Sequence, residues 1–558
     1  EAAAALRAAL PGAVVESVEP AVFAHGDGAR FVHVAVVETG GPLDRFEVVQ
    51  DASTGRPLFA RRLFVSARGY IYDPNPEVAP DHVEVDLPRL ASTTALDGEL
   101  ATAWACSDSR CRTLVRRATP DTDGNYLYMP LEGATDDAFA EVNAYFHIDR
   151  VNRFFEETLG FTWLCGTSRA MLVAVNMPVA NAFYGDINRD RCGDVVLGQG
   201  AVVDFAYDAD VIYHEFTHGV VDDVAGLIGW TADELGPDFS SGGLNEGTAD
   251  YFSVTIAGDP TLGEYAAREG MIGGELAIRS ADNTATCPRS LSGESHMDGR
   301  IWSGTTWEIR TAIGAAKTDR LVFDALASLS DVADFDEAGR ALISQASRLV
   351  GDGILTAADV AEVERITVER GLPGCERIID LGLGMAAAFS MGLDDLGGML
   401  SRMYSGVQFK IEAPADATRV QLTTSPFTVM PSGAYEVYMR KNQPIHFTVS
   451  GWSITLDGYD HRYTGSPAAP TPWRILLAPW TDPPLEPGTT YHFTIMHTNR
   501  TAVYMSLEGI VIRPPPPEDG GDGGEDAGDE ADGEDAEAFE ADGEDAEAFE
   551  DDDAGADA

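Results

Sequence analysis

Basic residues are scarce in this chain. Among its 558 residues, 38 are Lys or Arg and 91 are Asp or Glu, so the formal net charge is −53. Such an excess of negative charge repels the phosphate backbones of nucleic acids and anionic lipid, and nucleic acid is therefore not an expected partner. Long hydrophobic runs are also missing. No apolar stretch approaches the ~20 residues that cross a bilayer, so membrane insertion is not expected either.

Cysteine is scarce as well, and none of the six cysteines forms a CxxC pair. An even number of scattered cysteines favours disulfides in an exported protein over a cytosolic metal cluster, although buried free thiols give the same pattern. Local spacing supports only the first of the three pairs we expect, which are Cys106–Cys111, Cys287–Cys375 and Cys165–Cys192. The chain begins at Glu1, as it would after removal of a signal peptide. We expect a secreted, extracellular protein and leave attachment to a cell surface open.

The residues that are present divide the chain into several units, since ~100 to 200 residues per domain gives roughly three to five units for this length. Residues 1–66 combine an Ala-rich helix with strand-like runs and are predicted to form a small α+β domain. Residues 67–375 form a long mixed segment, which we take as the catalytic domain. Its hydrophobic patterns predict helices at 137–159, 209–224, 244–257 and 304–313.

The C-terminal part has a different composition. We expect a helical connector over residues 376–405 and an antiparallel β-sandwich over the Thr-, Tyr-, Phe- and Val-rich region 406–513. Residues 514–558 begin with four prolines and continue as an acidic tail, so we expect them to be disordered. From Glu518 onward this tail carries 21 acidic and no basic residues, which leaves −32 on the rest of the chain. A solvated spacer is the simplest role for it.

The stretch from Val211 to His218 contains the pattern HExxH. On a helix, positions four apart lie on one face, so His214 and His218 can present two imidazole nitrogens to one metal ion. Glu215 stands beside them and can handle protons. Because the pattern also occurs by chance in long proteins, its interpretation depends on a third ligand.

A second helical segment supplies that ligand. Glu246 lies 28 positions beyond His218, and Asp250, one helical turn further, can accept the other ring N–H of a ligating histidine. A solvated acidic helix face is the competing interpretation, but small and apolar neighbours favour a buried face. Two His and one Glu leave a fourth Zn²⁺ position open for water, as catalytic sites do. The pattern therefore predicts one catalytic Zn²⁺, with Glu215 as the general base for a water that attacks a peptide carbonyl.

The sequence HEFTHGVVDDVAGLIG, followed by GGLNEGTAD, resembles the thermolysin and fungalysin groups of gluzincin metalloproteases. The resemblance implies a multidomain α+β chain built on a two-lobed zinc protease. It also implies that Asn181 and Ala182 hold peptide substrate on an edge strand, and that Arg279 binds a substrate carbonyl. His296, with Glu294 as its orienting partner, is then the candidate for stabilising the oxyanion. A surface ion pair for Arg279 and an ordinary histidine are the alternatives.

The chain departs from this family pattern in places that concern the oxyanion and calcium. Gly229 stands where a tyrosine is expected after AGLI, so more of the oxyanion stabilisation falls on His296. Asp210 matches a calcium-binding position, but Ala257 replaces the glutamate expected to share the ion. Residues 186–194 carry polar side chains at alternate positions, as calcium loops do, although a hairpin turn is the simpler interpretation. Bound Ca²⁺ is therefore left open.

The same resemblance implies roles for the segments on either side of the catalytic domain. The first ~65 residues resemble the C-terminal part of the propeptide of these proteases, which implies a zymogen whose own pro-domain inhibits it. The β-rich region is similar to sandwich modules appended to secreted proteases, with substrate or surface binding as the implied role and mere stabilisation as the alternative.

These observations predict a secreted zinc endopeptidase that acts on protein or peptide substrates as a monomer. A zinc exopeptidase of the aminopeptidase kind is the alternative within enzymes. A catalytically inactive surface-binding protein is the alternative outside them. An edge strand for extended peptide favours internal cleavage, and the intact HExxH, Glu246 and Asp250 favour activity.

Overall fold

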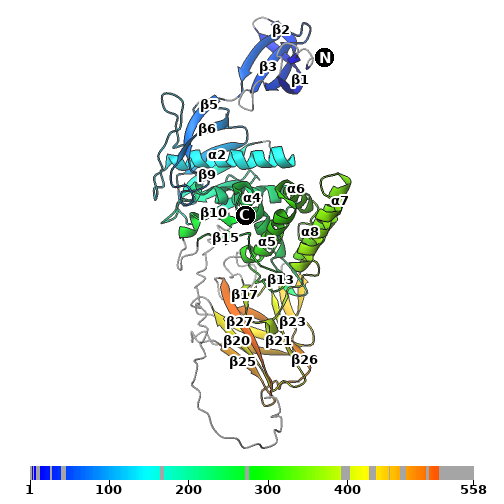
Figure 1. Ribbon diagram of the computed structural model, residues 1–558. Coiled ribbons are helices and arrows are strands. Elements are labelled where there is room, and N and C mark those ends of the chain that lie inside the picture. The colour runs from blue at the N-terminus through cyan, green and yellow to red at the C-terminus, as the bar shows by residue number, and fades with distance from the viewer. Residues whose placement is uncertain are drawn as a thin grey trace, which may run out of the picture.

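The computed structural model describes most of the chain up to residue 514. The described residues are 3, 6–7, 13–25, 28–38, 45–63, 65–92, 94–163, 169–190, 192–269, 276–390, 403–426, 435–451, 453–464, 473–497 and 502–514. Figure 1 shows three consecutive bodies, a small N-terminal sheet, a central body of helices and sheets, and a C-terminal pair of sheets. The acidic tail predicted to be disordered lies outside the described residues.

The N-terminal body is a four-stranded antiparallel sheet in the order β1-β2-β3-β4. Its strands are β1 (Val14–His25), β2 (Gly28–Glu38), β3 (Arg45–Asp51) and β4 (Pro57–Arg62). Ala35, Val37 and Val48 pack with Leu6 in a small core of their own. Most of the Ala-rich segment predicted to be helical lies outside the described residues.

The first lobe of the central body is built on a five-stranded sheet in the order β10-β11-β9-β7-β8. Its strands are β7 (Ala101–Cys106), β8 (Leu114–Val115), β9 (Met171–Met177), β10 (Ala182–Gly185) and β11 (Asp194–Gly198), and the hairpin β5 (Val65–Ile71) and β6 (Val83–Leu90) lies beside them. Helix α2 (Ala138–Phe154) begins at Asp137, whose side chain accepts the N–H groups of Phe139 and Ala140. A five-residue π-helical turn continues it to Leu159, so the predicted helix 137–159 is confirmed.

Helices make up most of the second lobe. They are α3 (Ala209–Val224), α4 (Ser240–Ala257), α5 (Ser295–Ile313), α6 (Ala315–Leu326), α7 (Phe335–Gly351) and α8 (Ala357–Glu369). Helix α3 has the predicted bounds, and α4 begins four residues before the predicted start at 244. Helix α5 was predicted only over 304–313. It begins nine residues earlier because the Glu294 side chain caps it by accepting the N–H groups of His296 and Met297.

The prediction of a helical connector over 376–405 is wrong for its described part. Residues 378–380 form β16 and residues 386–390 form β17, joined by a short 3-10 turn. Along β17 the alanines alternate between buried and half-buried positions, which is the period of a strand and not of a helix. Both strands belong to the C-terminal sheets, so those sheets begin before residue 406.

The C-terminal body is the predicted β-sandwich. One sheet has the order β16-β19-β26-β21-β24, with β18 also paired to β26, and the other has the order β17-β27-β20-β25. Buried residues of both sheets pack in one core, which includes Phe409, Val437, Phe493 and Leu507. The strands are β16 (Ile378–Asp380), β17 (Ala386–Ser390), β18 (Met403–Tyr404), β19 (Gln408–Ala413), β20 (Arg419–Pro426), β21 (Tyr435–Lys441), β22 (His446–Ser450), β23 (Ser453–Gly458), β24 (His461–Thr464), β25 (Trp473–Leu477), β26 (Thr489–His497) and β27 (Val503–Ile512).

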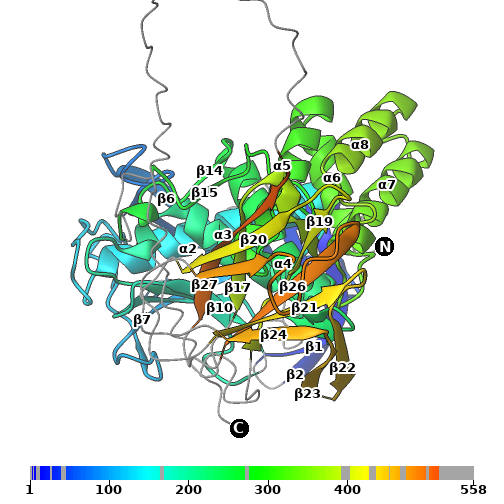
Figure 2. The same ribbon diagram turned by 90° about the horizontal axis from the view of Figure 1, so that it is seen from below.

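The sandwich packs against the helical lobe. One of its contacts is the short hairpin of β12 (Thr231–Asp233) and β13 (Gly236–Asp238), which leads into α4. The Phe447 N–H donates to the Glu234 carbonyl at 3.0 Å, and Gln408 Nε2 donates to the Leu235 carbonyl at 2.9 Å. Buried Arg377 contacts the Pro237 carbonyl and the Asp233 carboxylate. Figure 2, seen from below, accordingly shows the sandwich strands in front of α3, α4 and α5.

The described part of the chain contains two of the three expected disulfides, Cys106–Cys111 and Cys287–Cys375. For the third, Cys192 is disulfide-bonded, while its expected partner Cys165 lies outside the described residues. Within the described residues, no helix has both the length and the apolar character needed to span a membrane.

Candidate metal centre and active site

Helix α3 presents the two histidines of the HExxH pattern on one face. Asp208 caps the helix by accepting the Asp210 N–H, which fixes its start and therefore its register. The Nε2 atoms of His214 and His218 lie 3.1 Å apart. Glu215, between them in sequence, is buried with 7% of its surface exposed.

Helix α4 brings Glu246 to the same point. Its Oε2 lies 3.2 Å from His214 Nε2, and its Oε1 lies 3.7 Å from His218 Nε2. The three ligand atoms all lie within 4.8 Å of one another, and among the described residues this is the one group of three or more His, Cys, Asp or Glu that meets this spacing. The structure thus brings together the three residues predicted as ligands.

The donor set fits a zinc ion. Two imidazole nitrogens and one carboxylate leave a coordination position open, as catalytic zinc sites require. Glu246 Oε2 is buried and has no hydrogen-bond partner among the described residues, which a metal ion would satisfy. Burial favours the neutral acid, but the charges of His296 and His218 outweigh it and hold the pKa of Glu246 well below its usual range. Glu246 is therefore ionised, as a metal ligand would need to be.

A side-chain partner at Nδ1 orients each of the two histidines. His214 Nδ1 lies 3.0 Å from Asp250 Oδ1, and His218 Nδ1 lies 2.8 Å from Asn245 Oδ1. Partners at Nδ1 leave each Nε2 facing the metal position. The role of Asp250 was predicted from the sequence, whereas that of Asn245 was missed. The available signal for Asn245 was its position next to Glu246 on the ligand-bearing helix.

Arg279, predicted to bind a substrate carbonyl, has a partner inside the protein. It lies on β15 (Arg279–Ser280), where its Nη2 is 2.7 Å from Asp250 Oδ1 and its Nε is 2.9 Å from Asp250 Oδ2. Burial alone would raise the pKa of Asp250, but the Arg279 charge and the His214 contact lower it to about 2. Arg279 therefore keeps Asp250 ionised beneath His214, and its Nη2 also lies 3.9 Å from Glu246 Oε2.

His296 stands on the first turn of α5, facing the same centre. Its Nε2 lies 3.5 Å from Glu246 Oε1, and its Nδ1 lies 2.7 Å from Glu294 Oε1. The orienting partner expected for His296 is thus in place, and Glu294 both caps the helix and fixes the ring. Burial disfavours the charged imidazole, but the carboxylates of Glu246 and Glu294 prevail and raise the pKa of His296 to about 10.

Small residues set the distance between α4 and α5. A Cβ atom at Gly247 would lie only 2.4 Å from the Gly299 carbonyl oxygen, so the two helices touch through their backbones there. Gly247 follows Glu246 directly, and Gly299 lies three residues after His296. This close approach is what places the His296 side chain within reach of Glu246.

The edge strand is also where the sequence predicted it. Strand β10 pairs on one side with β11, is the last strand of its sheet, and packs beside α3, where Tyr184 contacts Gly219. Asn181 Oδ1 accepts the Ala182 N–H at 2.9 Å, so the backbone donor expected to hold substrate is occupied by the neighbouring side chain.

The positions linked to calcium form two different arrangements. Residues 186–190 follow β10 in the β10–β11 hairpin, and the Asp190 N–H donates to both the Asp186 and Asn188 side chains. Buried Asp210 lies beside Asp208 and Glu264, and its Oδ1 has no hydrogen-bond partner among the described residues. These three acids do not reach metal-ligand spacing within the described part of the chain.

Comparison with known proteins agrees with this geometry. Residues 105–222, which include His214 and His218, match the family described as "Thermolysin metallopeptidase, catalytic domain". The chain is 30% identical over 224 residues to a "Zinc metalloproteinase" of Renibacterium salmoninarum, covering 33% of this chain and 37% of that protein. It is 26% identical over 258 residues to an "Extracellular elastase" of Staphylococcus epidermidis, covering 42% and 46%.

Further similarities are shorter or looser. A "Protease PrtS" of Photorhabdus is 31% identical over 131 residues, covering 22% of this chain and 32% of that protein. The solved precursor of protealysin, a metalloproteinase from Serratia proteamaculans, aligns with a TM-score of 0.37 and 19% identity over 50% of this chain and 90% of that one. The chain spans less than half the length of the curated relatives that it matches. Residues 105–222 thus match a thermolysin-type metallopeptidase domain, and the similarity to a zinc metalloproteinase and to an extracellular elastase agrees with that match.

Proposed function

We propose that this chain is a secreted zinc-dependent endopeptidase that hydrolyses peptide bonds of protein substrates. The observation that carries the proposal is the convergence of His214, His218 and Glu246 within 4.8 Å, next to buried Glu215. A zinc ion held by these residues supplies a polarised substrate carbonyl and a water of lowered pKa, near 7 in such sites.

The chain's own residues then divide the remaining work. Glu215 takes the proton of the attacking water and passes it to the leaving amine. His296 donates from Nε2 to the oxygen that gains negative charge, since Glu294 holds its other nitrogen. Asp250 and Asn245 keep the two ligating histidines in their orientation.

Peptide substrate binds along the free edge of β10 in this proposal. Extended peptides add to exposed sheet edges through backbone hydrogen bonds, and a chain running past β10 passes beside α3. The Asn181 side chain releases the Ala182 N–H when substrate arrives, and the freed amide group of Asn181 binds the peptide. Arg279, already held by Asp250, reaches a substrate carbonyl with its remaining N–H groups. A site of this kind favours internal cleavage over the exopeptidase alternative.

The proposal also includes secretion of the chain and its activation by removal of the N-terminal domain. The disulfides Cys106–Cys111 and Cys287–Cys375 suit an oxidising compartment, and the matched Staphylococcus epidermidis protein is named an extracellular elastase. We assign residues 1–66 to a propeptide-like domain that inhibits the enzyme until it is removed. Its sheet lies at the far end of the central body from α5 (Figure 1), so inhibition requires this domain to approach the metal centre from that position.

The test compares casein hydrolysis by the chain lacking residues 1–66 with hydrolysis by its Glu215→Gln variant. We expect 1,10-phenanthroline to abolish hydrolysis, and the variant to bind one zinc ion per chain while losing at least about 10³-fold in kcat. Glu157→Gln, a change at an exposed glutamate on the turn after α2, is the matched control and should keep full activity. Full activity of Glu215→Gln, or hydrolysis that survives the chelator, contradicts the proposal.

A further inference from the structure

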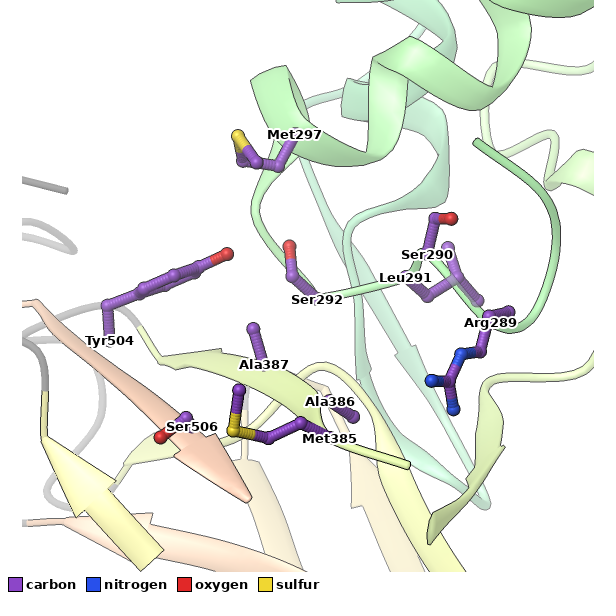
Figure 3. Close-up of a pocket in the computed structure, with 10 residues that line it drawn as sticks. All are labelled: Arg289, Ser290, Leu291, Ser292, Met297, Met385, Ala386, Ala387, Tyr504 and Ser506. Carbon is purple, nitrogen blue, oxygen red and sulfur yellow. The ribbon is translucent and has the colours of Figure 1, made fainter. Parts of the chain in front are cut away.

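A pocket lies between the catalytic lobe and the sandwich, and neither the metal centre nor the edge strand uses it. Its volume is about 290 Å³. One wall consists of the segment 289–292 and Met297 from the catalytic lobe, and the other of Met385, Ala387 and Tyr504 from the sandwich (Figure 3). We call it the interdomain pocket. It is at the small end of ligand sites, which suits one or two side chains.

The interdomain pocket shares α5 with the active site. Met297 follows His296 directly on α5, and neighbouring Cα atoms are ~3.8 Å apart. Since His296 Nε2 lies 3.5 Å from Glu246, the His296 side chain spans the remaining distance to the metal centre. An extended peptide advances ~3.3 Å per residue, so about three residues carry it from the scissile bond to Met297.

The loop that joins the two sites is held from both sides. Asp298 accepts the Ser292 N–H at 2.7 Å and the Gly293 N–H at 3.0 Å, which shapes the turn before Glu294. From the sandwich, the Phe389 N–H donates to the Ser292 carbonyl at 2.9 Å. Strand β17 therefore supports the segment that carries both Glu294 and His296, and the pocket wall keeps its place relative to the metal centre.

Apolar side chains make up much of the lining, together with three serines, Tyr504 and one cation, Arg289. Met297 and Met385 are 38% and 63% exposed, so both offer apolar surface to a bound chain. Methionine adapts to side chains of different shape. Arg289 contributes a buried Nη1 that has no hydrogen-bond acceptor among the described residues. A buried donor without an acceptor is costly, and a substrate carbonyl placed there satisfies it.

We propose that the interdomain pocket is a further substrate subsite, which takes an apolar side chain of an extended polypeptide and binds a neighbouring carbonyl through Arg289. The inference rests on the proposed function and assigns to the sandwich a direct part in substrate selection. We choose the substrate chain as its occupant because Met297, which lines the pocket, directly follows His296. A second copy of the protein is the other occupant, and the test below separates it from substrate.

The test measures how strongly the enzyme prefers a long substrate. Ala387→Trp places a large ring in the pocket, since the Ala387 Cβ points toward Ser292 in Figure 3, and Met385→Asp charges its wall. We compare KM for a twelve-residue peptide with apolar residues on both sides of the scissile bond with KM for a four-residue peptide. In both variants the ratio of long-peptide to short-peptide KM should rise about tenfold, which corresponds to ~1.4 kcal/mol of lost binding. Ile512→Asp, at an exposed position far along β27, should leave the ratio unchanged.

A second measurement does not depend on turnover. In the Glu215→Gln background, the Kd of the long peptide should rise about tenfold on addition of Met385→Asp, and Arg289→Met should also weaken binding. An unchanged KM ratio together with an unchanged Kd overturns the subsite. A shift of sedimentation coefficient with concentration that Met385→Asp removes overturns it in favour of self-association. If the unmodified enzyme does not cleave the short peptide, the proposed function itself fails. That outcome differs from an unchanged KM ratio and from self-association.

Discussion

Asp250→Asn probes the support of the metal centre. In the folded protein the Asp250 carboxylate contacts His214 Nδ1 at 3.0 Å, Arg279 Nη2 at 2.7 Å and Arg279 Nε at 2.9 Å. The substitution leaves Arg279, whose side chain is only 13% exposed, without its counter-charge. Removal of one member of a buried ion pair costs about 3 to 5 kcal/mol of folding free energy. Loss of the carboxylate behind a ligating histidine costs about 10- to 100-fold in metal affinity.

The two effects are measured separately. Chemical denaturation gives the loss of folding free energy, and competition with a zinc chelator gives the metal affinity. Asp149→Asn is the matched control. Asp149 is equally buried, lies 3.0 Å from Arg89 Nε, and sits on α2 away from the metal ligands. We expect both variants to lose stability and only Asp250→Asn to lose zinc affinity. Equal zinc affinity in the two variants refutes the reasoning.

Three further predictions follow from other parts of the structure. Gly247→Ala places a Cβ 2.4 Å from the Gly299 carbonyl, so it should cost about 1 to 3 kcal/mol in denaturation experiments and lower kcat, because α4 and α5 must separate. Burial raises the pKa of Glu141 to about 7. The folded state therefore holds a proton there that the unfolded state releases near pH 4, and the free energy of unfolding should fall by up to about 3 kcal/mol as pH rises from about 4.5 to 8. Glu141→Gln should flatten that part of the stability profile, and an unchanged slope contradicts the assignment. Replacing Cys287 and Cys375 by Ser opens a loop with a sequence separation of 88 and should cost about 4 kcal/mol, measured as a lower denaturation midpoint.

The ligand helices were predictable because their signals are local. Asp208 at the N-cap and apolar residues at helical spacing set the bounds of α3, and a helix with known bounds fixes which faces His214 and His218 share. The same reasoning placed Glu246 on α4. What the sequence could not supply was the crossing of α4 and α5, which depends on backbone contact between Gly247 and Gly299.

The misses concern side chains whose role depends on tertiary contacts. The sequence prediction gave Arg279 a substrate contact but not its pairing with Asp250, which follows only from the position of β15 beside α4. Asn245 behind His218 needed the same information. The alanines at 386–388 favoured a helix by intrinsic propensity, but burial against β27 made them a strand. Packing against a neighbouring strand can therefore override the intrinsic helix propensity of a segment.

Zinc K-edge X-ray absorption on the purified chain tests the central claim most directly. The account predicts one zinc ion per chain, with two imidazole nitrogens and carboxylate or water oxygens at ~2.0 to 2.2 Å. His218→Ala should remove one imidazole contribution. A first shell with sulfur at ~2.3 Å, or a chain that retains no zinc after purification without chelators, contradicts the assignment of His214, His218 and Glu246 as the ligands.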